Sequence, residues 1–195
     1  MKQRSLQNLR PAAHWLAAAW VLMVALVSPT LARGPVPIDR DRTQIRFSID
    51  AIGWPTTRGT FRSFSGRIAV DIDNPSRSDV RFEVASGSID TGSATLDDYI
   101  KGAAFLNAAR FPTISFVSTD VSKLDDRTAR IEGDMTLLGV TRPVALTVVV
   151  QRMAGARVGL AASGIIRRSQ FGMVSGQPLI LDDINLTVTT ETIAP

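Results

Sequence analysis

The sequence predicts an all-β fold in which eight antiparallel strands form a sandwich or a barrel, with one or two short helices. Two observations carry this prediction. Apolar and polar residues alternate with a period of two in eight short segments, as in strands that bury one face. Turn-forming Gly, Pro, Asn and Asp residues separate these segments, a spacing typical of small all-β domains.

Each predicted strand is a run in which every second residue is apolar. In chain order the runs are Ile45 to Ala51, Phe61 to Ile72 with a bend near Gly66, Val80 to Val84, Ile114 to Phe116, Ile131 to Leu137, Val144 to Val150, Val158 to Ala162, and Ile184 to Val188. Strands of this number and length are enough for a closed antiparallel barrel, which has no exposed sheet edges.

Residues 131–150 form the clearest predicted β-hairpin. On its first strand Ile131, Gly133, Met135 and Leu137 share one side, which we expect to face the core. We place the turn over residues 139–143, because Gly139 supplies backbone freedom and proline at the end of the turn needs no ladder donor. A strand pair with one apolar face has to be covered by other parts of the fold.

One segment has helical spacing instead. Residues 95–98, Thr-Leu-Asp-Asp, have the spacing of a capping box, and four apolar positions then recur at helical intervals: Leu96, Tyr99, Ile100 and Ala103. We expect a helix of two to four turns that packs on the barrel, with an ion pair between Asp97 and Lys101. A second helical turn is predicted around residues 168–171.

Residues 1–32 have the pattern of a secretory signal peptide. A basic start precedes an apolar run from Trp15 to Val27, and small residues surround Ala32. That run is shorter than the roughly 20 residues that span a bilayer, which favours cleavage over an uncleaved anchor. The mature chain is then residues 33–195, and its expected location is the periplasm.

The charge of the mature chain is close to neutral. Three of the 22 basic residues and none of the 18 acidic residues lie in the leader, which leaves 19 against 18 and a formal charge of +1. A nucleic-acid-binding protein needs a concentrated basic face, so this class is disfavoured. Cysteine is absent, so the fold depends on its apolar core rather than on disulfides.

The sequence offers little catalytic chemistry. The single histidine, His14, lies in the leader, which removes imidazole- and thiol-based nucleophile systems and His or Cys zinc sites from the mature chain. Three adjacent acidic pairs, at residues 97–98, 125–126 and 182–183, occupy helix starts or turns, where Asp bonds to the backbone. We therefore predict no catalytic residue, no metal and no cofactor.

Five stretches resemble the YceI-like family of lipocalin-like proteins associated with polyisoprenoid binding. In chain order they are Gly59-Thr-Phe-Arg-Ser-Phe-Ser-Gly66, Ser88-Ile-Asp-Thr-Gly92, Phe111-Pro-Thr-Ile-Ser-Phe-Val-Ser118, the hairpin 131–150, and Arg167-Arg-Ser-Gln-Phe-Gly-Met173. The resemblance covers nearly all of residues 33–195, and the five stretches have the order and spacing that the family leads us to expect. Where the family has an Arg-Asp-x-His-Leu run, this chain has Leu96-Asp-Asp-Tyr-Ile100, so no role of that histidine transfers.

The resemblance implies an eight-stranded antiparallel lipocalin-like barrel around an apolar channel. It also implies an exported, non-enzymatic carrier or store of a long-chain amphiphile, either a polyisoprenoid or an isoprenoid quinone. Transient membrane contact and a homodimer are open alternatives for its interactions. A barrel of this kind could instead be packed solid by its aromatic side chains and act as an envelope stress or interaction module. A third reading is an enzyme acting on a lipid.

Candidate ligand contacts follow from the alternation and from the resemblance. The predicted channel lining is Phe47, Ile49, Phe61, Phe64, Phe82, Tyr99, Phe105, Phe116, Met135, Leu137, Phe171 and Met173. The predicted contacts to a polar head group are Arg142, Arg167, Arg168 and Ser169. Arginine suits this role because its forked donors match a phosphate or a quinone oxygen.

Overall fold

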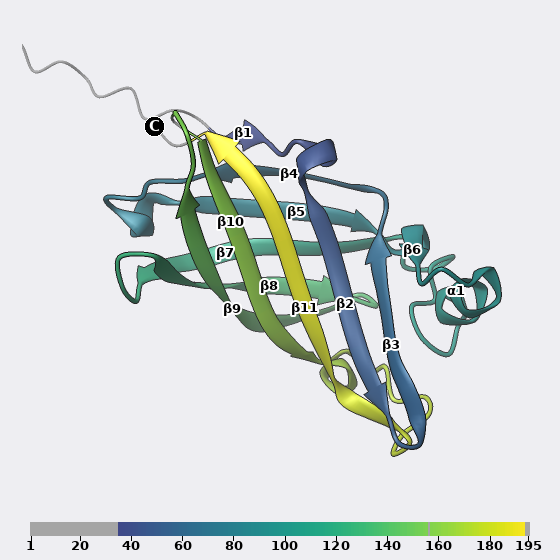
Figure 1. The fold of residues 1–195 in the computed structure, drawn as a ribbon. Helices are drawn as coiled ribbons and strands as arrows, with labels where there is room; N and C mark the ends of the chain where they lie inside the picture. The colour runs from purple at the N-terminus through teal and green to yellow at the C-terminus, as the bar shows by residue number, and fades with distance from the viewer. Residues whose placement is uncertain (1–34, 156, 194–195) are drawn as a thin grey trace, which may run out of the picture. The chain divides into compact units, whose positions relative to one another are not determined.

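The computed structural model describes residues 35–155 and 157–193, which form one curled antiparallel sheet (Figure 1). The predicted signal peptide lies outside the described residues. The strands are β1 (Val36–Pro37), β2 (Gln44–Ala51), β3 (Trp54–Phe61), β4 (Phe64–Ala69), β5 (Asp79–Ala85), β6 (Ile89–Asp90), β7 (Thr113–Lys123), β8 (Thr128–Leu137), β9 (Val140–Arg152), β10 (Arg157–Arg167) and β11 (Ile180–Ile193). The helices are α1 (Ala94–Lys101) and four 3₁₀ turns at Arg40–Arg42, Pro75–Arg77, Ser86–Ser88 and Arg168–Phe171.

The strands follow the order β1-β4-β5-β7-β8-β9-β10-β11-β2-β3-β6. The sheet curls into a half-barrel, so that β9, β10, β11, β2 and β3 pass in front of β4, β5, β7 and β8 at a steep angle (Figure 1). The predicted all-β class is confirmed. The described residues contain eleven strands rather than eight, two of them only two residues long.

One predicted strand is divided in two, and its neighbour was missed. The expected run from Phe61 to Ile72 contains the end of β3, a corner at residues 62–63, and β4, which ends at Ala69. At this corner the Arg62 amide donates to the Ser88 carbonyl, and the Ala85 amide donates to the Ser63 carbonyl. Strand β3 was not predicted, because apolar and polar residues do not alternate in its sequence, Trp-Pro-Thr-Thr-Arg-Gly-Thr-Phe.

The β8–β9 hairpin has a tighter turn than predicted. Residues 138 and 139 form a two-residue turn with positive φ at both positions, 54° and 73°, and Leu137 pairs with Val140. Pro143 therefore lies inside β9, opposite Asp134, at a position whose nitrogen points away from β8. The predicted inward face is confirmed, because residues 131, 133, 135 and 137 are all buried.

Glycines make room for two aromatic rings on the inner face of the sheet. Gly59 lies directly across from Phe47, and a Cβ at residue 59 would lie 2.6 Å from the ring of Phe47. A Cβ at Gly133 would lie 2.5 Å from both the ring of Phe116 and the carbonyl oxygen of Val117. Both rings lie close to the strand beside them because these positions carry no side chain.

The cap of helix α1 lies two residues before the predicted cap, and the helix ends before Ala103. The side chain of Ser93, rather than Thr95, accepts the helix-capping bond, from the Leu96 amide. The helix ends at Lys101, which leaves Ala103 exposed beyond it. Lys101 pairs with Asp98 rather than with Asp97. The predicted helical turn at residues 168–171 is confirmed.

Asp97 has a different partner, because it accepts hydrogen bonds from the amide and the hydroxyl of Thr91. These bonds join the first turn of α1 to the segment that follows β6. Within residues 35–155 and 157–193, no helix combines the length and the hydropathy needed to cross a bilayer.

We predict that Gly133→Ala lowers the free energy of unfolding by about 2 kcal/mol, because the new methyl group overlaps the Phe116 ring and a strand carbonyl. Urea titration followed by circular dichroism measures this change. The matched control is Gly159→Ala in β10, where a Cβ would meet nothing closer than 3.6 Å. Equal destabilisation of the two variants would contradict the packing role assigned to Gly133.

Candidate ligand-binding cavity

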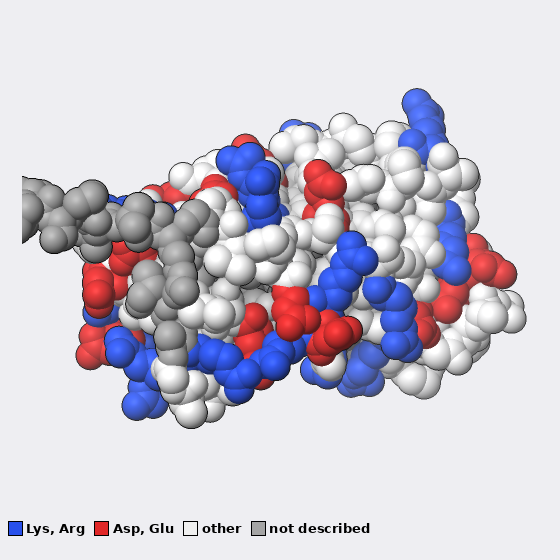
Figure 2. Space-filling view, turned by 90° about the horizontal axis from the view of Figure 1, so that it is seen from above, with Lys and Arg blue, Asp and Glu red and all other residues white. Residues whose placement is uncertain are grey.

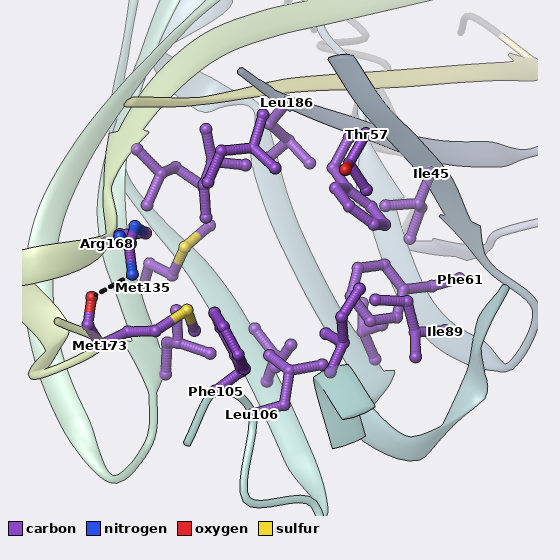
Figure 3. Close-up of a pocket in the computed structure, with 18 of the residues that line it drawn as sticks. Ile45, Thr57, Phe61, Ile89, Phe105, Leu106, Met135, Arg168, Met173 and Leu186 are labelled. Carbon is purple, nitrogen blue, oxygen red and sulfur yellow. Dashed lines mark hydrogen bonds between the residues drawn. The ribbon is translucent and has the colours of Figure 1, made fainter. Parts of the chain in front are cut away.

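The curled sheet encloses a cavity of about 770 Å³ between its two layers (Figure 3). Side chains from β2, β3, β5, β7, β8, β10 and β11 form most of its wall, and the rest comes from β6, β9, α1, residues 105–106, Arg168 and the segment 173–179. Cavities that hold small molecules in proteins have volumes of about 300–1,000 Å³. The inner face of the sheet is therefore not packed solid, which contradicts the filled-core alternative.

The wall of the cavity is almost entirely apolar. Among its lining residues only Thr57, Tyr99, Ser115 and Arg168 carry a hydroxyl or a charged group. The remainder are aliphatic, aromatic, Met, Pro or Gly residues, and no carboxylate or lysine lies among them. A wall of this kind favours hydrocarbon and offers a polar ligand few partners.

Most of the residues predicted to line a channel lie on this wall. They are Phe47, Ile49, Phe61, Phe82, Tyr99, Phe105, Phe116, Met135, Leu137 and Met173. Phe64 and Phe171 do not, and this part of the prediction is wrong. Phe64 packs in a separate core cluster with Ile45 and Val84, while Phe171 is 1% exposed within the main core.

Sequence reasoning missed two kinds of wall residue. Leu146, Ile184 and Leu186 occupy the inner face of predicted strands, so the same alternation that marked Phe47 could have found them. Ile166 lies beyond the predicted strand from Val158 to Ala162 but continues its alternation, because β10 extends to Arg167. A second group comes from irregular segments without any periodicity: Trp54 and Pro55 at the start of β3, and Gly176 and Leu179 before β11. Sequence spacing carries no signal for this second group, because their position depends on which loops meet at one end of the sheet.

Among the residues that the structure describes, Arg168 is the one charged side chain on the cavity wall, and it is fully buried. Its Nε donates to the carbonyl of Leu181, its Nη1 to the carbonyls of Met173 and Ser175, and its Nη2 to the carbonyl of Ile180, at 2.8–2.9 Å. Figure 3 shows the bond to Met173 at the edge of the cavity. Burial lowers the pKa of the guanidinium from its ordinary value, and Asp182 opposes that shift.

These four bonds give Arg168 a structural role. Its guanidinium gathers the carbonyls of residues 173–181 around one point and so shapes the irregular segment that forms part of the cavity wall. Four of its five N–H groups donate to backbone carbonyls in this arrangement. Arg168 is thus largely committed to the protein rather than available to a head group.

The other predicted head-group contacts lie outside the cavity wall. Arg167 is exposed and pairs with Asp183 across β10 and β11 at 3.8 Å. Arg142 is exposed and donates to the carbonyl of Gln170 at 3.3 Å. The structure therefore does not bring these two arginines into the site, and it leaves their assignment as head-group contacts without support.

Ser169 is also engaged elsewhere. Its amide and hydroxyl donate to the two oxygens of Asp182, each at 2.8 Å. The hydroxyl bond is the main cause that lowers the pKa of Asp182 below 3.8. The pKa of Asp182 is thus lower in the folded than in the unfolded protein. The bond from Ser169 therefore stabilises the fold at pH values above 3.8, and this contribution is lost as the pH falls through the folded-state pKa of Asp182.

The three acidic pairs occupy structural positions. Asp125 accepts from the amide of Arg127 in a turn, and Asp126 pairs with Lys123. In the second pair Asp97 bonds to Thr91 and Asp98 pairs with Lys101. In the third pair Asp182 bonds to Ser169 and Asp183 pairs with Arg167. Among the residues that the structure describes, no group of three or more His, Cys, Asp or Glu side chains is arranged to hold a metal ion.

Comparison with known proteins agrees with this architecture. The family model described as "YceI-like domain" matches residues 37–192. The UPF0312 protein of Enterobacter sp. strain 638 is 34% identical over 152 residues, which cover 75% of this chain and 79% of that protein.

Two solved structures share the fold. Burkholderia cenocepacia BcnA superposes with a TM-score of 0.74 at 20% identity, over 80% of this chain and 99% of that one. A polyisoprenoid binding domain from Saccharophagus degradans superposes with a TM-score of 0.62 at 12% identity, over 78% of this chain and 94% of that one.

We predict that Arg168→Lys lowers the free energy of unfolding by about 3 kcal/mol, because one ammonium group cannot reach four separate carbonyls and leaves buried acceptors unpaired. Urea titration measures the loss, and limited proteolysis should show faster cleavage within residues 174–179. The adjacent Arg167→Lys is the control, with a change below about 0.5 kcal/mol, since its ion pair is exposed. A variant Arg168→Lys as stable as the Arg167→Lys control would refute the role of the guanidinium.

Proposed function

Since the chain belongs to the YceI-like family, we propose that it is a non-enzymatic carrier or store of a long-chain amphiphile. The observation that carries this proposal is the cavity of about 770 Å³ with its nearly continuous hydrocarbon wall. The predicted export signal at residues 1–32 supports a periplasmic location for this activity.

The size and chemistry of the wall are sufficient for useful affinity. Each buried methylene group contributes about 0.8 kcal/mol, so ten of them provide about 8 kcal/mol before the losses of freedom on binding. A dissociation constant of about 1 μM needs a net of about 8 kcal/mol, so methylene groups beyond the tenth have to offset the losses of freedom on binding. A chain longer than ten carbons then binds through its hydrocarbon part alone, and shape and length set the selectivity.

The preferred cargo is a polyisoprenoid or an isoprenoid quinone. A structural neighbour from Saccharophagus degradans is described as a polyisoprenoid binding domain, which supports an isoprenoid here as well. The branched methyl groups of an isoprenoid chain suit a wall of Ile, Leu, Val, Phe and Met side chains. The hydroxyls of Thr57 and Ser115 on the wall suit a neutral oxygen such as a quinone carbonyl, and a charged head group remains in solvent at the mouth.

A substitution on the inner face of β10 tests the cavity directly. We predict that Ala162→Trp reduces the affinity for a fluorescent polyisoprenoid analogue at least tenfold, because the indole fills space that the ligand needs. Ala162 lies on the cavity wall, and the preceding Ala161 is exposed on the outer face of the same strand. Ala161→Trp is therefore the matched control and should bind like the unchanged protein.

Fluorescence titration gives both affinities, and urea titration verifies that the two variants remain folded. Equal affinity of the Ala162→Trp and Ala161→Trp proteins would exclude the cavity as the binding site.

The natural cargo can be identified without assuming its structure. We expect solvent extraction of the exported protein, purified without detergent, to release an isoprenoid lipid in near-stoichiometric amount, detected by mass spectrometry. The extract of the Ala162→Trp protein should contain at least tenfold less of it. A protein that carries no lipid and takes up no polyisoprenoid analogue would refute the carrier function.

A further inference from the structure

The mouth of the cavity is marked by side chains that belong both to its wall and to the outer surface. Trp54 is 75% exposed and Leu179 is 59% exposed, and both line the cavity. Tyr99 of α1 also lines the cavity while remaining 60% exposed. The cavity therefore meets solvent between the β2–β3 hairpin, the segment before β11, and α1.

Two of these parts form one continuous edge. The Ile52 amide donates to the Leu179 carbonyl at 2.8 Å, and Ala51 pairs with Ile180. In Figure 1 the tip of the β2–β3 hairpin and the chain entering β11 lie together at one end of the sheet. We refer to residues 51–57 and 172–181 together as the rim.

The rim carries no charged residue over its whole length. It nevertheless exposes five large apolar side chains: Ile52, Trp54, Val174, Leu179 and Leu181. The face of the molecule in Figure 2 differs, because basic and acidic side chains are interspersed over it. A cluster of exposed apolar side chains without charges marks a surface that contacts another apolar phase.

We propose that the rim docks on the surface of a lipid bilayer, so that the mouth of the cavity opens directly onto the hydrocarbon. This inference rests on the proposed carrier function, since a long-chain amphiphile resides in membranes and is poorly soluble in the water between them. The apolar wall and the apolar rim are continuous through Trp54 and Leu179, so a chain can pass between bilayer and cavity without crossing water.

The composition of the rim matches a bilayer interface. Tryptophan, here Trp54, favours the interfacial region of membranes, and aliphatic side chains insert just below it. An uncharged rim has no ion to desolvate on insertion, and it gains nothing from anionic lipids. Docking should therefore be reversible and insensitive to salt.

Vesicles of neutral phosphatidylcholine provide the test. The protein lacking residues 1–32 is suitable because residues 32–195 form a compact unit by themselves. Trp54 is then the only tryptophan, since Trp15 and Trp20 are removed with the leader. We expect co-flotation with the vesicles in 0.5 M as well as 0.05 M NaCl, accompanied by a blue shift of the Trp54 emission.

Two substitutions test the rim at residues that lie outside the cavity wall. Ile52→Asp and Val174→Asp place a carboxylate on rim positions that do not line the cavity, and each should reduce co-flotation at least tenfold. Affinity for the fluorescent polyisoprenoid analogue, presented without vesicles, should change less than twofold. Ile165→Asp is the control and should float normally, because Ile165 is 57% exposed on β10 away from the rim.

Each outcome decides a separate question. Flotation that persists in both rim variants, or an unchanged protein that does not float, overturns the docking proposal even when the analogue binds. A dimer in sedimentation experiments that Ile52→Asp dissociates would assign the rim to a second copy of this chain and also overturn it. If the unchanged protein floats with the vesicles but does not bind the polyisoprenoid analogue, the carrier function is refuted and the docking surface is not.

Discussion

The constraint on which this structure depends is a sheet with one apolar face and, in the part of the chain that is described, a single short α-helix to cover it. Helix α1 has eight residues, and none of them is fully buried. The long strands of the sheet therefore have to bury their inner face against each other, which the curl achieves by passing β9, β10, β11, β2 and β3 over β4, β5, β7 and β8 (Figure 1). Side chains from the two layers do not fill the enclosed space, and an apolar cavity remains.

Period-two alternation predicted the sheet because it reports directly on which face of a strand is buried. It placed residues 131–137 and most of the aromatic wall correctly. It failed where burial is not periodic, as in β3 and in residues 173–180. It also cannot distinguish a ring that faces a cavity from one that faces a neighbouring side chain, which is why Phe64 was misplaced. Phe171 lies in the helical turn at residues 168–171, where alternation gives no information about which way a ring points.

The arginines show a second limit of sequence reasoning. Arg167 and Arg168 are adjacent, yet one is exposed in a surface ion pair and the other is buried among four carbonyls. Both positions read as head-group donors, because an arginine near a predicted loop usually faces solvent. The partners of Arg168 are backbone carbonyls within residues 173–181. Every residue type has such a carbonyl, so the sequence of that segment does not indicate that it binds an arginine.

The way α1 is attached has a consequence for the size of the cavity. The helix supplies Leu96, Tyr99 and Ile100 to the wall, but it adds no strand to the sheet and is joined at its start through the Asp97–Thr91 bonds. Displacing it outward breaks no inter-strand ladder, so it can open at a lower free energy than the strands around it. The cavity thus has one side that is not tied into the sheet, and under the proposed carrier function this is the side where a longer chain would find room while the sheet keeps its register.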